Sequence, residues 1–117
     1  MPTLTIAGTV SFPLAEEATP PSRPFSAQLI YTERSIDDVV IVGAQSDVDL
    51  MGQLTDAKAC YVECTDGEGE FKINGATPTI KVTVDGGFLI WLNPDGGMTA
   101  LSLTTSDNAS FRIYLFA

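Results

Sequence analysis

The chain has 117 residues, 44% hydrophobic and 18% charged, which is the composition of one globular domain and argues against a chain that is disordered as a whole. Fifteen acidic and six basic residues give a formal net charge of −9, and such a chain should repel nucleic acid. The bases form no cluster and no apolar run approaches the roughly 18 residues that span a bilayer, so we expect no membrane partner.

The first predicted element is a strand near the N-terminus. Its apolar positions are Leu4, Ile6, Gly8, Val10 and Phe12. They alternate with small and hydroxylated residues, and alternation with period two is typical of a strand with one covered face. Residues 13–24 then contain four prolines, which remove backbone donors and favour an extended path. We expect this segment to be either a loop or an arm that carries the first strand to a neighbouring copy.

Further short strands follow at the spacing expected of sandwiches and barrels. We predict them at residues 25–33, 38–42, 47–51, 57–65, 70–74, 79–85, 88–92, 99–104 and 110–116. Glycine-rich turns separate them, and the turn at 85–87 gives the clearest predicted hairpin. We therefore predict a single all-β domain over residues 1–117, an antiparallel β-sandwich or jelly roll of eight to ten short strands.

Two predicted strands, 88–92 and 110–116, are apolar on both faces. A two-layer sandwich covers only one face of each sheet, so part of this excess should stay uncovered and form an association surface. The side chains that we expect on it are Leu89, Trp91, Tyr114 and Phe116, with Leu4, Ile6, Val10 and Phe12 added if the first strand crosses to a neighbouring copy. The alternative is that the proline-rich segment folds over them.

Residues with catalytic chemistry are sparse. The chain has no histidine, which excludes Ser-His-Asp and Cys-His arrangements and the usual zinc sites. Carboxylates at 37–38 and at 47 and 49 could cleave glycosides only within a cleft that fixes their separation, and they are equally typical of solvated turns. Cys60 and Cys64 would lie roughly 13 Å apart on one strand, too far to bridge. We expect no enzymatic activity, no cofactor and free thiols.

One acidic turn is a candidate calcium site. Asp66, Glu68 and Glu70 alternate with glycines, and their oxygens could converge on Ca²⁺, which takes six to eight oxygen ligands. The other interpretation is a charged hairpin tip that prevents edge-to-edge aggregation. We predict no other metal site.

The C-terminal part of the chain resembles a family of proteins. The strand 88–92, the turn Asn93-Pro94-Asp95-Gly96-Gly97, the threonine-rich strand 99–105 and the apolar strand 109–116 are similar to small tailed-phage virion proteins. These are head decoration (cement) proteins, head fibres and related jelly-roll modules, and the resemblance covers residues 57–117. It implies a non-enzymatic protein, made in the host cytoplasm and located in the virion, often a trimer, that binds the major capsid protein or another virion protein.

A second function is compatible with the residues. Exposed aromatic side chains can stack on sugar rings, and Tyr31, Tyr61, Trp91 and Tyr114 are the candidates. The alternative to a homo-oligomeric virion protein is therefore a monomeric carbohydrate-binding β-sandwich module.

Overall fold

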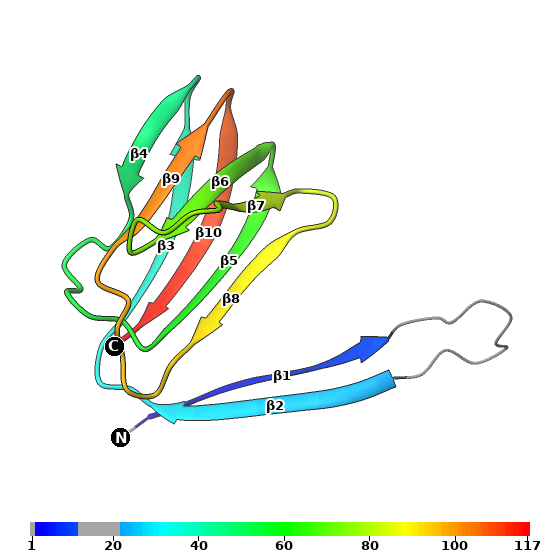
Figure 1. The fold of residues 1–117 in the computed structure, drawn as a ribbon, viewed down its shortest axis with the longest axis vertical. Coiled ribbons are helices and arrows are strands. Elements are labelled where there is room, and N and C mark those ends of the chain that lie inside the picture. Colours follow the sequence, from blue (N-terminus) through cyan, green and yellow to red (C-terminus); the bar gives the residue numbers. More distant parts are fainter. Residues whose placement is uncertain (1, 12–21) are drawn as a thin grey trace, which may run out of the picture. The chain divides into compact units, whose positions relative to one another are not determined.

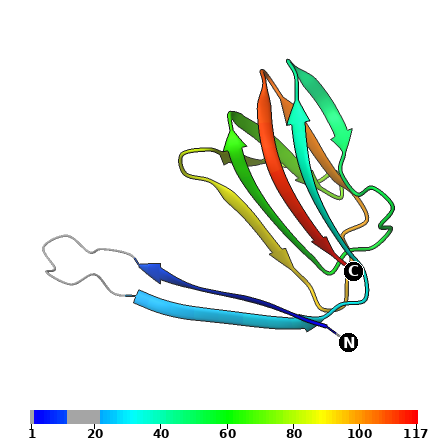
Figure 2. The ribbon, with the colours of Figure 1, turned by 180° about the vertical axis from the view of Figure 1, so that it is seen from behind.

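A computed structural model of the chain describes residues 2–11 and 22–117. Their ten β-strands fall into two compact units, Met1–Tyr31 and Thr32–Ala117 (Figures 1 and 2). The all-β class and the strand number agree with the sequence prediction. The described residues contain no helix with the length and apolar character needed to cross a bilayer.

The first unit is a hairpin of β1 (Thr3–Ser11) and β2 (Ser22–Ile30), paired antiparallel. Part of the segment predicted as a loop or arm belongs to it, because residues 22–24 lie in β2. Pro24 is tolerated there, since each strand of a two-stranded ribbon has one edge at which no donor is needed. Residues 12–21, which include the remainder of that segment and the predicted interface residue Phe12, lie outside the described ranges.

The second unit is a jelly roll of two four-stranded antiparallel sheets (Figure 1). One sheet has the order β3 (Arg34–Ile41), β10 (Ala109–Phe116), β5 (Ala59–Asp66), β8 (Phe88–Leu92). The other has the order β4 (Gln45–Asp49), β9 (Leu101–Thr105), β6 (Glu68–Ile73), β7 (Ile80–Thr83). Apart from β6 and β7, strands that follow each other along the chain lie in opposite sheets, as in a jelly roll.

The predicted hairpin at residues 85–87 is wrong. Strands β7 and β8, on either side of this turn, belong to different sheets, and their ladder partners are β6 and β5. Gly87 donates to the Thr83 carbonyl at 3.3 Å, so the local turn exists, but the chain uses it to pass from one sheet to the other. The residues of a turn indicate that the chain changes direction, but they do not indicate which strands pair with each other.

The jelly-roll interior is filled by side chains. Phe71 of β6 and Phe111 of β10 meet edge to face across the two sheets, with ring centroids 5.2 Å apart. Gly69 is buried beneath them, and a Cβ added there would lie 2.5 Å from Leu103 and 2.8 Å from Phe111. The centre of the sandwich therefore has no room for an additional methyl group, and still less for a ligand.

Candidate association surface

The sheet β3-β10-β5-β8 has one face on the core and one face turned away from it. Residues directly opposite each other on neighbouring strands share a face, so the strand registers define rows across the sheet. We call the side turned away from the core the outer face. One of its rows is Ile36, Tyr114, Tyr61 and Ile90, and the next is Asp38, Arg112, Glu63 and Phe88.

Large apolar side chains are exposed on the outer face. Ile36 is 50% exposed, Val40 is 71% exposed and Phe88 is 62% exposed. Ile90 and Leu92 are partly exposed beside Phe88 on β8, at the edge of the sheet opposite Ile36 and Val40. Single exposed apolar residues are ordinary, but a group of them on one sheet face marks an interaction site.

Three aromatic rings form the middle of this face. Tyr61 lies between Tyr114 and Phe88, with ring centroids 5.5 Å and 6.4 Å away and tilted planes. Burial raises the pKa of Tyr61, and the charge of Glu63 raises it further. The Tyr61 hydroxyl donates to Glu63 Oε2 at 3.4 Å, so the phenol stays neutral and keeps its donor role. The result is an amphipathic aromatic patch of the kind enriched at interfaces.

An ion pair adjoins the aromatic patch. Arg112 donates to both carboxylate oxygens of Asp38, from Nε at 2.8 Å and from Nη2 at 3.3 Å. The hydrogen bond from Arg112 lowers the pKa of Asp38, and the same bond is the main reason that the pKa of Arg112 is raised. This pairing neutralises the Asp38 carboxylate on the outer face and places a guanidinium beside Tyr114.

Three of the four predicted interface residues in strands 88–92 and 110–116 are buried or face the core, which corrects the prediction. Leu89 is 5% exposed and belongs to the core, because its cross-strand partner Val62 faces the core. Phe116 is 9% exposed in a row where Arg34 and Ala59 lie directly opposite it. Trp91 is partly buried and packs against the core, so it does not belong to the outer face. Tyr114 does lie on the outer face.

The predicted interface residues of the first strand have partners in their own chain. Leu4 lies opposite Leu29, Ile6 opposite Ala27 and Val10 opposite Arg23, so β1 forms an intrachain hairpin. Their side chains share one face of the hairpin with Phe25, and Val10 remains 53% exposed. That this face contacts a neighbouring copy stays a prediction.

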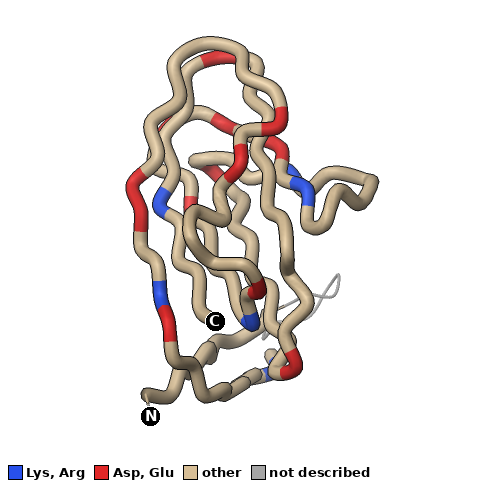
Figure 3. Tube along the Cα trace, turned by 90° about the vertical axis from the view of Figure 1, so that its left-hand side faces the viewer, with Lys and Arg blue, Asp and Glu red and all other residues tan. Residues whose placement is uncertain are grey.

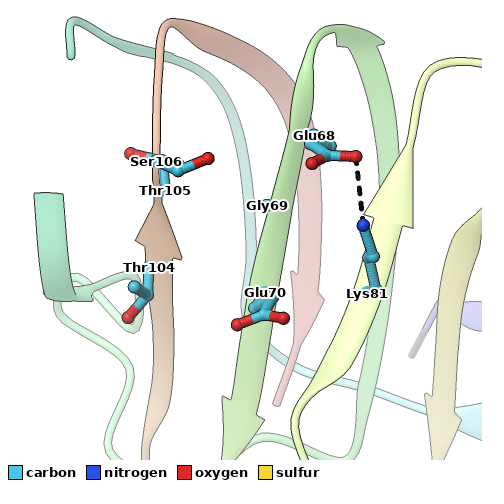
Figure 4. Close-up of a pocket in the computed structure, with 7 residues that line it drawn as sticks. All are labelled: Glu68, Gly69, Glu70, Lys81, Thr104, Thr105 and Ser106. Carbon is cyan, nitrogen blue, oxygen red and sulfur yellow. Dashed lines mark ion pairs between the residues drawn. The ribbon is translucent and has the colours of Figure 1, made fainter. Parts of the chain in front are cut away.

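The candidate calcium site does not form. Asp66 ends β5 in one sheet, whereas Glu68 and Glu70 lie on β6 in the other sheet, since the chain turns a corner at Gly67. Lys81 Nζ lies 3.3 Å from Glu68 Oε2, so this carboxylate already has a cationic partner within the chain (Figure 4). Within the described ranges, no three acidic, cysteine or histidine residues gather closely enough to hold a metal ion.

A surface pocket of about 180 Å³ lies beside this ion pair. Its lining residues are Glu68, Gly69, Glu70, Lys81, Thr104, Thr105 and Ser106 (Figure 4). The wall therefore combines acidic groups, one ammonium group and hydroxyl groups. Pockets that bind small molecules are usually larger and lined mainly by apolar side chains, so this pocket does not resemble a typical ligand site.

The adjacent carboxylates do not form catalytic pairs. Asp37 and Asp38 lie on opposite faces of β3, where Asp37 accepts from the Ser35 hydroxyl at 3.0 Å and Asp38 pairs with Arg112. Asp47 lies 3.7 Å from Lys72, and Asp49 accepts from the Met51 amide at 3.0 Å. Each of these four carboxylates thus has a local partner, and Asp37 is the one that lines a surface pocket, without Asp38 beside it.

The two cysteines are free, as predicted. Burial raises the pKa of Cys60 to about 12. Cys64 donates to the carbonyls of Asp66 and Gly67 at 3.2 Å, and burial raises its pKa as well. Both are therefore protonated thiols at neutral pH, which makes them poor nucleophiles.

Comparison with known proteins supports the fold. No family model matches the chain, and no curated protein matches it. A crystal structure of an RmlC-like cupin protein from Desulfovibrio desulfuricans is similar, with a TM-score of 0.51 and 14% sequence identity. The match covers 75% of this chain and 77% of that protein. At this identity the likeness extends to the β-sandwich fold and carries no activity with it.

Proposed function

We propose that the protein is a non-enzymatic structural subunit of a virion, a capsid decoration protein or a related head or tail component, that binds its own copies and a capsid. The outer face carries this proposal. It combines exposed aliphatic and aromatic side chains with an arginine held in a fixed ion pair, which are the residue types that dominate protein interfaces. The assignment to a virion draws on the resemblance of residues 57–117 to phage decoration proteins.

The charge distribution supports an apolar contact between copies. All acidic and basic residues except Glu16, Glu17 and Arg23 belong to residues 32–117, and acidic positions outnumber basic ones along the trace (Figure 3). Two copies repel each other wherever these acids meet. The row of Ile36, Tyr114, Tyr61 and Ile90 carries no charge, so it is a part of the surface where close approach is favourable.

The non-enzymatic part of the proposal rests on chemistry. The chain has no histidine, and the paired carboxylates lie on opposite faces of a strand or in local contacts. The centre of the sandwich is packed without space for a substrate. A structural role requires neither catalytic residues nor a cavity for a substrate.

Phe88→Ser should weaken self-association. The ring is 62% exposed on the outer face, so removing it takes an aromatic anchor from the interface at little cost to the fold. We expect the dissociation constant from sedimentation equilibrium to rise at least about tenfold, which corresponds to about 1.4 kcal/mol. The matched control is Val84→Ser, because Val84 is 49% exposed but lies outside the outer face and should change nothing. Equal effects from the two substitutions would remove the outer face from the proposal.

The virion assignment has a separate test. Mass spectrometry of purified tailed-phage particles that encode this chain should find it in the particle, and its gene should lie beside a major capsid gene. A chain that is absent from such particles would refute the virion role while leaving self-association intact.

Carbohydrate binding is the second candidate, and one observation favours it. Tyr61, Tyr114 and Phe88 form a partly exposed aromatic group on a sheet face, which could stack on sugar rings. Trp91 is not part of that group, because it faces the core. A glycan array separates the functions: discrete glycan hits that disappear in Tyr61→Ala favour the carbohydrate module, and a silent array favours the assembly subunit.

A further inference from the structure

We propose that two copies of the protein join edge to edge through β8, which pairs antiparallel with β8 of the second copy about a two-fold axis beside Ile90. This inference rests on the proposed self-association and places its contact at the β8 edge of the outer face, where Phe88 and Ile90 lie, so that the part of the outer face on β3 and β10 stays uncovered in the dimer. The four-stranded sheet β3-β10-β5-β8 of one copy would then continue into the same sheet of the second copy, which gives one sheet of eight strands.

The four edge strands of the jelly roll are protected unequally. Edge strand β3 carries Asp37 and Asp38, and β4 carries Asp47 and Asp49 together with an irregular register. Edge strand β7 carries Lys81. Charges and irregularities of this kind prevent strands from pairing with other chains. Edge strand β8 has the sequence Phe-Leu-Ile-Trp-Leu, with no charge and no proline, and so lacks this protection.

The hydrogen bonds show which backbone groups of β8 are available. Asn93 donates to the carbonyl of Lys58 at 2.7 Å, and the register places these two residues directly opposite each other. In an antiparallel ladder such bonded pairs alternate with unbonded ones. Leu89 and Trp91 therefore bond to β5. The N–H and C=O groups of Phe88, Ile90 and Leu92 point away from β5, and within the described residues β8 pairs with β5 alone.

These outward groups are arranged for self-pairing. With a two-fold axis beside Ile90, Ile90 lies opposite its own copy and Phe88 lies opposite Leu92. All of these residues have outward backbone groups, so each pair is a bonded pair and the ladder is complete along the strand. Every cross-strand side-chain pair is apolar, which adds to the stability of the ladder.

The second copy is the occupant that the charges favour. A contact at β8 joins the uncharged edges of the sheet β3-β10-β5-β8 in the two copies and leaves the acidic edge strand β3 at the far end of each sheet. The exposed side chains of Phe88 then extend the two outer faces into one surface. A two-fold contact gives a dimer, with twice the chain mass of 12.4 kDa, instead of the trimer that the family resemblance implies.

Ile90→Cys tests the register directly. Bonded antiparallel pairs have Cα atoms about 5.5 Å apart, which is within the range that a disulfide bridges. Under mild oxidation we expect most of this variant to run as a disulfide dimer that reducing agent reverses. Ile36→Cys is the matched control, because Ile36 is on the outer face at the opposite edge and should stay monomeric on a denaturing gel. The two native thiols give little background, since Cys60 is buried and Cys64 donates to two backbone carbonyls of its own chain.

Ile90→Pro and Ile90→Lys test the contact without depending on oxidation. The Ile90 amide points away from β5, so proline removes an intermolecular donor and no ladder bond within the chain. Lysine places two like charges opposite each other at the axis. We expect the dissociation constant of each variant to rise at least tenfold, with an unchanged circular dichroism spectrum.

The outcomes separate this inference from the proposed function. If the wild type self-associates but Ile90→Cys does not cross-link, and Ile90→Lys associates as tightly as the wild type, the β8 contact is wrong and association uses another surface. If the wild type is monomeric throughout, the proposed function and the β8 contact both fall.

Discussion

Phe111→Ala is expected to lower the free energy of unfolding by about 3–5 kcal/mol. Phe111 is 1% exposed, and its ring meets Phe71 edge to face across the two sheets. The end of the ring also lies 2.8 Å from where a Cβ of Gly69 would be, so it covers the backbone of β6 directly. Truncation leaves a cavity that neighbouring β-strands cannot close. Urea unfolding followed by the fluorescence of the single tryptophan, Trp91, measures the loss.

Phe88→Ala is the control for this experiment because it makes the same chemical change at a residue that is 62% exposed. At concentrations where the chain is monomeric, it should cost less than about 1 kcal/mol. Similar losses at the two positions would mean that Phe111 does not fill the centre of the core.

Gly67→Ala should destabilise the fold by about 2–4 kcal/mol, as the sum of two costs. Gly67 connects β5 to β6 at the corner between the sheets, with φ at +74°, a conformation that is unfavourable for a residue with a side chain. A Cβ there would lie 2.5 Å from the carbonyl oxygen of Asn108 and 3.1 Å from the Cα of Ala109. Both are backbone atoms, which cannot move aside as a flexible side chain can. Urea unfolding again gives the value.

Gly43→Ala separates the two costs. Gly43 has φ at +72°, and nothing lies within 4 Å of the position of its added Cβ. It therefore carries only the conformational cost of about 1–2 kcal/mol. The difference between the two variants measures how tightly the β5–β6 corner packs against residues 108–109. No difference would show that the corner adjusts freely.

Most of the strands could be predicted from the sequence, because alternation and turn residues are local signals. Residues 88–92 and 110–116 were predicted as strands with nearly the bounds that the structure has. The fold class followed from the absence of any helical periodicity. The pairing of strands could not be predicted in the same way, since it depends on contacts between residues far apart in sequence. The turn at 85–87 illustrates this, because its residues fit a hairpin equally well.

The candidate surface was predicted in part. Two strands that are apolar on both faces indicate the sheet that carries the surface, and Tyr114 lies on its outer face. In Phe88–Leu92 all five residues are apolar, so alternation cannot decide which of them face the core, and the predicted pair Leu89 and Trp91 belongs to the inner face. The register with β5 decides it, because Val62 is fully buried opposite Leu89. Phe88 and Ile90 were missed for this reason.

The central claim is that the jelly roll self-associates, and native mass spectrometry of the wild-type chain over a range of micromolar concentrations tests it most directly. We predict a concentration-dependent species with twice the chain mass of 12.4 kDa. A chain that stays at 12.4 kDa over the whole range would contradict the account.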